Sequence, residues 1–402
     1  MLDIVVPIVL FVVILGAVIF VHELGHFFFA RRAGIFVEEF ALGMGPKLFS
    51  FHGKKRSLLP KSRAPGPPPD DEEDSESGAG EECGEQKPEI GDLTLYSLRA
   101  LPIGGFCRMR GQDEDVPDDP EAMNNKGVFA RIMVIAGGSL MNFAAAFLLF
   151  FALTMLRGFP IAEVVSLNEE MPGYRAGLQV GDRITHINGA SVRLYEDFVF
   201  MVGSAGGQEM EVRVARGAES VELRIAPAQS EDGRRLIGFS PNWRLGFLDE
   251  MPDEPDGFSS RVGLGEGLAV SADLVLFNIR APFRLLAGLF GGRPMPEGGG
   301  VMGPIGIGGV VAEVYQDSVE FGFWHTFLQM LMFAALLNAM LGVMNLLPVP
   351  ALDGARLVFL FIEAVRRKPV APEREAMVHV AGLVALLVFA VFVAYRDIAR
   401  FL

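Results

Sequence analysis

Cysteine is nearly absent from this chain, because only two of its 402 residues carry a thiol, Cys83 and Cys107. Two thiols cannot cross-link a chain of this length, and they form no CxxC pair. The sequence therefore suggests neither a disulfide framework nor a cysteine zinc site. A basic excess is also missing, since the net charge is −14. The negative charge is local, because residues 64–92 hold eleven acidic residues and one basic residue, Lys87. The charge balance therefore says little about nucleic acids or acidic ligands.

Charged residues are absent or rare in four long apolar stretches of a chain that is 50% hydrophobic. The first stretch, residues 4–21, is an uninterrupted run of eighteen apolar residues. Runs of roughly twenty apolar residues can cross a bilayer as helices. A fifth segment, residues 265–290, carries four charged residues and is better interpreted as an amphipathic helix at the membrane surface. The sequence predicts a polytopic α-helical membrane protein whose four transmembrane helices lie at residues 1–30, 129–157, 321–353 and 376–396.

The start of the chain reads as a retained helix and not as a signal peptide. It begins Met1-Leu2-Asp3 without a basic segment, and the apolar run leads into His22 without a small-residue cleavage site. Lys and Arg residues cluster after the first and third apolar stretches, which places loops 31–128 and 354–375 in the cytoplasm. Both chain ends and the region 157–320 are then expected on the outer side, although Arg157, Arg396 and Arg400 also lie there.

The first cytoplasmic loop divides into unlike parts. Residues 64–92 are rich in Pro, Gly and acidic residues, so we expect a disordered, solvated insertion. Residues 94–110, TLYSLRALPIGGFCRMR, alternate apolar and polar side chains and contain the Gly104-Gly105 break. This pattern predicts a β-hairpin-like loop associated with the membrane surface.

A small α/β domain is predicted outside the membrane at residues 158–230. It combines short strand-like runs with one helix near residues 195–202, and Asn188-Gly189 is a strong hairpin signal. The stretch PGYRAGLQVGDRITHINGASV, residues 172–192, resembles the core of a bacterial, circularly permuted PDZ domain. Such domains bind extended peptides or free carboxylates by strand addition, whereas the simpler alternative is a spacer. Residues 231–320 would form a linker that contains the amphipathic helix.

An HExxH pattern, His22-Glu23-Leu24-Gly25-His26, lies at the inner end of the first stretch. Residues four apart share nearly one face of a helix, so His22 and His26 can bind one metal ion. Glu23 is then placed to take a proton from a metal-bound water, whose pKa zinc lowers to roughly 7. HExxH alone occurs by chance in many soluble helices. Ionisable side chains directly after an apolar run are costly, however, and indicate a functional site.

Asp353 is the best candidate for the third ligand that a catalytic zinc site needs. It lies in NLLPVPALDG, residues 345–354, where Pro348 and Pro350 break the third helix and free backbone groups to face a cavity. Asp353 could by itself be a turn residue or a helix cap before Gly354. Because HExxH lies on another predicted helix, we favour the ligand interpretation.

These motifs together resemble the site-2 protease family of intramembrane metalloproteases, and most closely its bacterial branch that acts on anti-sigma factors. The resemblance rests on FVHELGH, NLLPVPALDG, the PDZ-like segment, YSLRALPIGGFCRMRGQDE, GGSLMNFAAAFLLF and GPIGIGG. It implies an intramembrane zinc endopeptidase of the bacterial cytoplasmic (inner) membrane, with His22, His26 and Asp353 as Zn2+ ligands and Glu23 as general base. The β-loop would hold the substrate extended, and the resemblance gives Asn345, Tyr96, Gly104 and Gly105 as substrate-binding residues.

The implied partners are membrane proteins with a transmembrane segment, the lipid bilayer and peptides or C-termini at the PDZ-like domain, but no nucleic acid. One departure is Met340, where the family often has a second asparagine, with Asn338 two residues earlier. Two other interpretations stay open, an idle membrane scaffold that presents a PDZ domain and a metal-transit protein. Anti-sigma factors and remnant signal peptides are both possible substrates.

Overall fold

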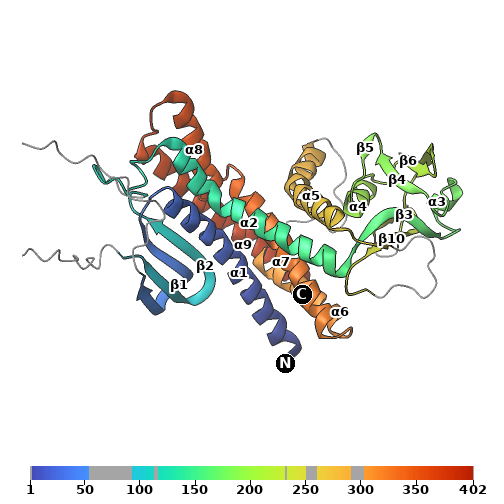
Figure 1. Cartoon of the computed structure of the whole chain (residues 1–402), viewed down its shortest axis with the longest axis horizontal. Helices are drawn as coiled ribbons and strands as arrows, with labels where there is room; N and C mark the ends of the chain where they lie inside the picture. The colour runs from blue at the N-terminus through green and yellow to red at the C-terminus, as the bar shows by residue number, and fades with distance from the viewer. Residues whose placement is uncertain are drawn as a thin grey trace, which may run out of the picture.

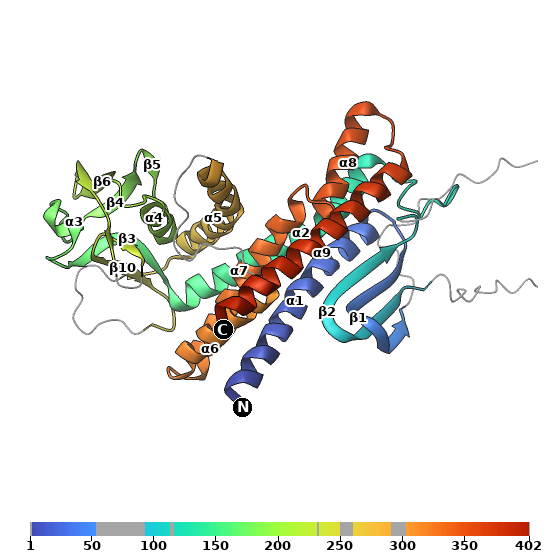
Figure 2. The same cartoon turned by 180° about the vertical axis from the view of Figure 1, so that it is seen from behind.

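The structure is a computed structural model, and it describes residues 2–53, 93–112, 116–230, 233–249, 260–290 and 303–401. The acidic insertion predicted at residues 64–92 lies outside the described residues. Figures 1 and 2 show a bundle of long helices with a small sheet on one side and a separate domain on the other. The helices are α1 (Leu2–Arg32), α2 (Val128–Arg157), α3 (Pro172–Arg175), α4 (Tyr195–Gly203), α5 (Leu264–Phe290), α6 (Pro304–Val319), α7 (Phe323–Leu346), α8 (Asp353–Arg366) and α9 (Pro372–Phe401).

Four of these helices, α1, α2, α7 and α9, are long and apolar enough to cross a membrane. This confirms the prediction of four apolar membrane helices. Glycine allows α1 and α2 to cross with their backbones in contact, because a Cβ added to Gly25 would lie 2.2 Å from the carbonyl oxygen of Gly137. Small residues permit this kind of close helix packing in membranes. Gly25 belongs to the HExxH segment, so the close crossing brings α2 against the two histidines.

Two long strands, β1 (Val37–His52) and β2 (Leu95–Met109), form the sheet beside α1. Both strands bend, so that Phe40 lies opposite both Cys107 and Tyr96. The bends fall at glycines, and Gly104 has φ +90°, which glycine adopts readily. Buried side chains of the sheet, among them Val37 and Phe40, share one apolar core with α1, α2 and α8. This core fixes the sheet against the helices that carry the metal-binding motifs.

The domain on the other side of the bundle is built on a seven-stranded sheet with the order β11-β10-β3-β4-β6-β7, and β5 pairs with β4. Asn188 and Gly189 turn the chain between β4 and β5, which confirms the hairpin predicted there. The sheet continues past the predicted boundary at residue 230, because β10 pairs with β3. Its strands are β3 (Phe159–Leu167), β4 (Arg183–Ile187), β5 (Ala190–Ser191), β6 (Met210–Arg216), β7 (Glu219–Ile225), β10 (Phe239–Leu245) and β11 (Ser260–Arg261), with a separate pair β8 (Ala228–Gln229) and β9 (Arg235–Leu236).

Helix α5 joins this domain to the bundle. Its apolar face packs on α2 and α7, where Val275 lies in one buried cluster with Ala146 and Ala339. Its polar face reaches the domain, because Arg284 Nη1 donates to Asp197 Oδ1 of α4 at 2.9 Å. The helix is thus amphipathic, as its charges predict, and it contacts protein on both of these faces.

Candidate metal centre

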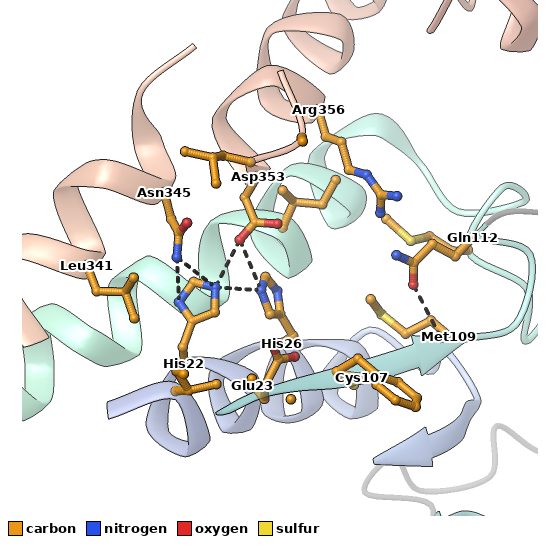
Figure 3. A pocket seen from close by; sticks show the side chains of 18 residues that line it. His22, Glu23, His26, Cys107, Met109, Gln112, Leu341, Asn345, Asp353 and Arg356 are labelled. Atoms are coloured by element: carbon orange, nitrogen blue, oxygen red, sulfur yellow. Dashed lines mark hydrogen bonds and ion pairs between the residues drawn. The ribbon is translucent and has the colours of Figure 1, made fainter. Parts of the chain in front are cut away.

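Three side chains that are far apart in the sequence meet where α1 and α8 approach each other (Figure 3). His22 and His26 come from consecutive turns of α1, and Asp353 is the first residue of α8. The Oδ2 atom of Asp353 lies 3.0 Å from His22 Nε2 and 3.1 Å from His26 Nε2, and the two nitrogens are 3.2 Å apart. Both imidazoles are buried. The structure therefore brings together the three ligands predicted from the sequence.

The spacing of these atoms fits a zinc ion. Zn–N bonds of roughly 2.0–2.1 Å in a tetrahedron put neighbouring ligand atoms about 3.3 Å apart, close to the three distances in the structure. Nδ1 of His26 lies 2.9 Å from the carbonyl oxygen of Val134, which can only accept, so this nitrogen carries the proton. Nε2 of His26 then has a free lone pair directed at the cluster. In most metal-binding histidines, the ring nitrogen that does not bind the metal donates a hydrogen bond of this kind, which fixes the orientation of the ring.

Two asparagines surround His22. The Asn142 amide nitrogen is 3.3 Å from His22 Nδ1, and the Asn345 amide nitrogen is 3.2 Å from His22 Nε2. Asn142 is fully buried, and in this orientation its Oδ1 atom has no hydrogen-bond partner. Exchanging the oxygen and nitrogen of the Asn142 amide would let Oδ1 accept a hydrogen bond from the Nδ1–H of His22, which leaves His22 Nε2 free for a metal. The unsatisfied oxygen is thus explained if His22 is a metal ligand.

Gly138 of α2 forms the wall behind the two histidines. A Cβ added at this position would lie 2.6 Å from His26 Nε2 and 2.6 Å from His22 Cε1. Carbon and nitrogen atoms in contact are normally about 3.5–4.0 Å apart. Only glycine therefore leaves room for both rings to converge on one point.

Glu23 lies on the same turn of α1 as His22 and points toward the sheet. Its carboxylate accepts a hydrogen bond from the backbone N–H of Cys107 in β2. A Cβ added to Gly105 would lie 3.2 Å from Glu23 Cγ, so the strand passes directly beside this side chain. Burial, together with the nearby charge of Glu23, raises the pKa of the Cys107 thiol. Cys107 does not belong to the described group of His22, His26 and Asp353 whose ligand atoms lie within 4.8 Å of one another.

A cavity of about 360 Å³ opens in front of these groups (Figure 3). It is lined by the three ligands, by Glu23, by the β2 segment from Gly104 to Cys107 and by Asn345. Three of the predicted substrate-binding residues, Gly104, Gly105 and Asn345, thus face the space beside the metal ligands. Tyr96, the fourth, is elsewhere among the described residues, because its ring stacks on Phe51 at 5.1 Å.

Asn338, the other asparagine of α7, is also absent from the described lining of the cavity. Asn338 donates its amide hydrogen to the Ala334 carbonyl at 2.8 Å, and Met340 is 54% exposed on the outside of the helix. Sequence reasoning missed four residues that surround the centre, Gly138, Asn142, Gln112 and Arg356. The signal for Asn142 is a buried amide within an apolar span, which is costly unless it has a partner.

Comparisons with known proteins found a family model and relatives that match most of the chain, and a solved structure similar to a small part of it. The model of peptidase family M50 matches residues 10–60 and 87–389. Regulator of sigma-W protease RasP of Bacillus subtilis is 30% identical, and the alignment covers 98% of both chains. Zinc metalloprotease RasP of Oceanobacillus iheyensis is 28% identical, with 98% of this chain and 99% of the relative covered. The PDZ domain of the SdrC-like protein of Listeria monocytogenes is 22% identical, with a TM-score of 0.19 over 21% of this chain and 86% of that chain.

Proposed function

Because the chain belongs to peptidase family M50 and is a multi-pass bacterial membrane protein, it is a zinc metalloendopeptidase, and we propose that it cuts membrane proteins within or next to their transmembrane segments. The observation that carries the proposal is the position of the metal centre well inside a helix that is long and apolar enough to cross a membrane. His22 lies ten residues before the end of the span Val5–Arg32. At 1.5 Å per residue, this is about 15 Å inside the helix end, whereas the hydrocarbon core is about 30 Å thick. A substrate that reaches this centre is at membrane depth.

We assign the roles in the site from its geometry. His22, His26 and Asp353 would hold the zinc ion, which supplies a water of lowered pKa and polarises the scissile carbonyl. Glu23 is the general base, because its carboxylate lies between the ligand cluster and the β2 strand. The Asn345 amide nitrogen lies 3.2 Å from His22 Nε2. It is therefore placed to donate a hydrogen bond to the carbonyl oxygen of the scissile peptide bond, which gains negative charge during the attack.

The β2 strand would hold the substrate. Its residues 105–107 pair with β1 on one side and line the cavity on the other, so an extended segment can add as a further strand. Peptide groups in an intact helix are internally hydrogen-bonded, and the substrate helix must therefore unwind first. Pairing with β2 would replace some of the backbone hydrogen bonds that unwinding breaks, which matters in lipid because no water is available.

The remaining parts of the proposal concern location and substrate. We place the protein in the cytoplasmic (inner) membrane, with the PDZ-like domain outside the cytoplasm as a docking site or size filter. Anti-sigma factors are supported as substrates by the name of the Bacillus subtilis relative, a regulator of a sigma factor. Remnant signal peptides would fit the same site. The scaffold alternative is disfavoured, because all three ligands and Glu23 are retained and assembled. The metal-transit alternative is disfavoured, because it gives no role to the β2 strand beside the site or to the PDZ-like domain.

The proposal is tested on the full chain purified in detergent, by measuring bound zinc and the cleavage of a model transmembrane substrate. We expect about one zinc per chain, loss of cleavage with retained zinc in Glu23→Gln, and loss of both in Asp353→Ala. Glu320→Gln and Asp317→Ala, exposed acidic residues of the α6 segment, are the matched controls and should behave as wild type. Cleavage by Glu23→Gln at the wild-type rate would overturn the assignment and favour the scaffold.

A further inference from the structure

The loop that carries Asp353 contacts the last membrane helix. Between α7 and α8, Ala351 adopts φ +73°, a left-handed conformation that is unfavourable for a residue with a Cβ. Two of the loop's N–H groups bond within the loop, from Val349 to Leu347 and from Leu352 to Val349. The N–H of Ala351 instead donates to Nδ1 of His379 in α9 at 3.2 Å. A side chain 28 positions further on therefore satisfies a backbone group two residues before the proposed metal ligand.

Helix α9 is held against this loop by close packing. Gly382 is three residues after His379, so both lie on one face of the helix. A Cβ added to Gly382 would lie 1.9 Å from Pro350 Cβ, which leaves no room for any other residue. The His379 ring also contacts the ring of Phe359 on α8, with centroids 5.9 Å apart. The imidazole is thus confined between the loop and the helix that Asp353 begins.

The tautomer of His379 follows from these contacts. Nδ1 must be unprotonated, because it accepts the Ala351 N–H. The proton is then on Nε2, which lies 3.8 Å from Glu375 Oε1 and has no hydrogen-bond partner among the described residues. His379 lies outside the described lining of the cavity, whereas Ala351 and Leu352 line it beside Asp353. Any effect of His379 on the metal centre must therefore pass through the loop between α7 and α8.

We propose that His379 is a positioning residue, which accepts the Ala351 N–H and thereby holds the Asp353 loop in the conformation that binds zinc. This inference rests on the proposed role of Asp353 as a ligand. Without the acceptor, the Ala351 N–H loses its described partner, and the left-handed turn at Ala351 loses a contact that stabilises it. The turn then relaxes and moves the carboxylate. Ligand positions must hold to within about 0.5 Å, so a small shift of this loop weakens metal binding.

The test compares three variants of the full chain in detergent. In His379→Asn, the side-chain oxygen can take the place of Nδ1, because both atoms are three bonds from Cα. His379→Gln carries its oxygen one bond further out, and His379→Leu has no acceptor. For each variant, zinc affinity is measured by competition with a chelator, and kcat and KM are measured on one transmembrane substrate. Val384→Ala, on an exposed part of the same helix, is the control.

We expect His379→Leu and His379→Gln to lose about 10–100-fold in zinc affinity and in kcat with little change in KM, as for removal of a supporting hydrogen bond at a metal site. His379→Asn and the control should stay within about threefold of wild type. Equal losses in the Asn and Leu variants would overturn the proposal, since packing alone would then explain them, and so would wild-type zinc affinity in His379→Leu. Asp353→Ala, measured in parallel, separates this outcome from failure of the ligand assignment itself.

Discussion

Replacing Gly138 with alanine tests the metal centre through a residue that is neither a ligand nor a base. The added methyl carbon would lie 2.6 Å from His26 Nε2 and 2.7 Å from His22 Nε2. Normal contact distances begin near 3.5 Å, so each ring must retreat by roughly 0.8–0.9 Å. Metal–ligand distances tolerate only about 0.2 Å. Both nitrogens would therefore leave the positions in which they share one ion with Asp353.

The expected loss in zinc affinity is at least about 100-fold, which corresponds to about 2.8 kcal/mol at 1.4 kcal/mol per factor of ten. Zinc affinity is measured by chelator competition, and cleavage of a transmembrane substrate is assayed at saturating zinc. Helix propensity does not explain such a loss, because alanine is a better helix former than glycine by about 1 kcal/mol.

Gly127→Ala is the matched control for this variant. Gly127 caps the start of the same helix, and a Cβ added there meets nothing within 4 Å. The control should bind zinc and cut as the wild type does. If Gly138→Ala bound zinc within about threefold of wild type while keeping its fold, the two histidines could not share an ion in the arrangement described.

Three further variants probe the surroundings of the centre. Asn142→Leu removes the amide that is 3.3 Å from His22 Nδ1 and should lower zinc affinity about 10–100-fold in a chelator titration. Gly105→Ala places a methyl group 3.0 Å from the Ala41 carbonyl oxygen and 3.2 Å from Glu23 Cγ, so we expect kcat to fall roughly tenfold with zinc retained, and unchanged kcat would show that neither the strand nor Glu23 is held as tightly as these distances imply. Arg131→Met leaves the partly buried Glu363 of α8 without its ion-pair partner and should destabilise the protein by about 1–3 kcal/mol in thermal unfolding, whereas the double variant with Glu363→Met should recover most of that loss.

The sequence predicts the local parts of the site well. HExxH sets two ligands on one helix face, because i and i+4 spacing is a property of every α-helix. The pairing of these histidines with Asp353, 331 positions away from His22, follows from no local spacing rule. It was predicted from the proline-broken end of a second apolar helix and from the need for a third ligand, and the family resemblance added support. Gly138 and Asn142 were missed because the apolar pattern of α2 does not show which face meets the histidines.

The sheet formed by β1 and β2 also depends on a long-range pairing that the sequence pattern does not reveal. Alternation in residues 94–110 predicted a β-loop, but the partner strand, Val37–His52, was not recognised. Its pairing with β2 joins segments separated by the acidic insertion, so no turn motif marks the register. Tyr96 lies on the predicted strand, yet its ring packs on Phe51 and Phe40 inside the sheet. Strand position alone does not decide which residues face the cavity.

The distribution of the ligands along the chain has a consequence for biosynthesis. His22 and His26 emerge first from the ribosome, whereas Asp353 and the α9 helix that packs on its loop come near the end. If these three residues hold the zinc ion as proposed, a partly synthesised chain lacks a complete zinc site, although His22, Glu23 and His26 have already been made. We therefore expect a chain that ends before Asp353 not to cleave its substrate, and a chain that also lacks α9 to hold the Asp353 loop less firmly.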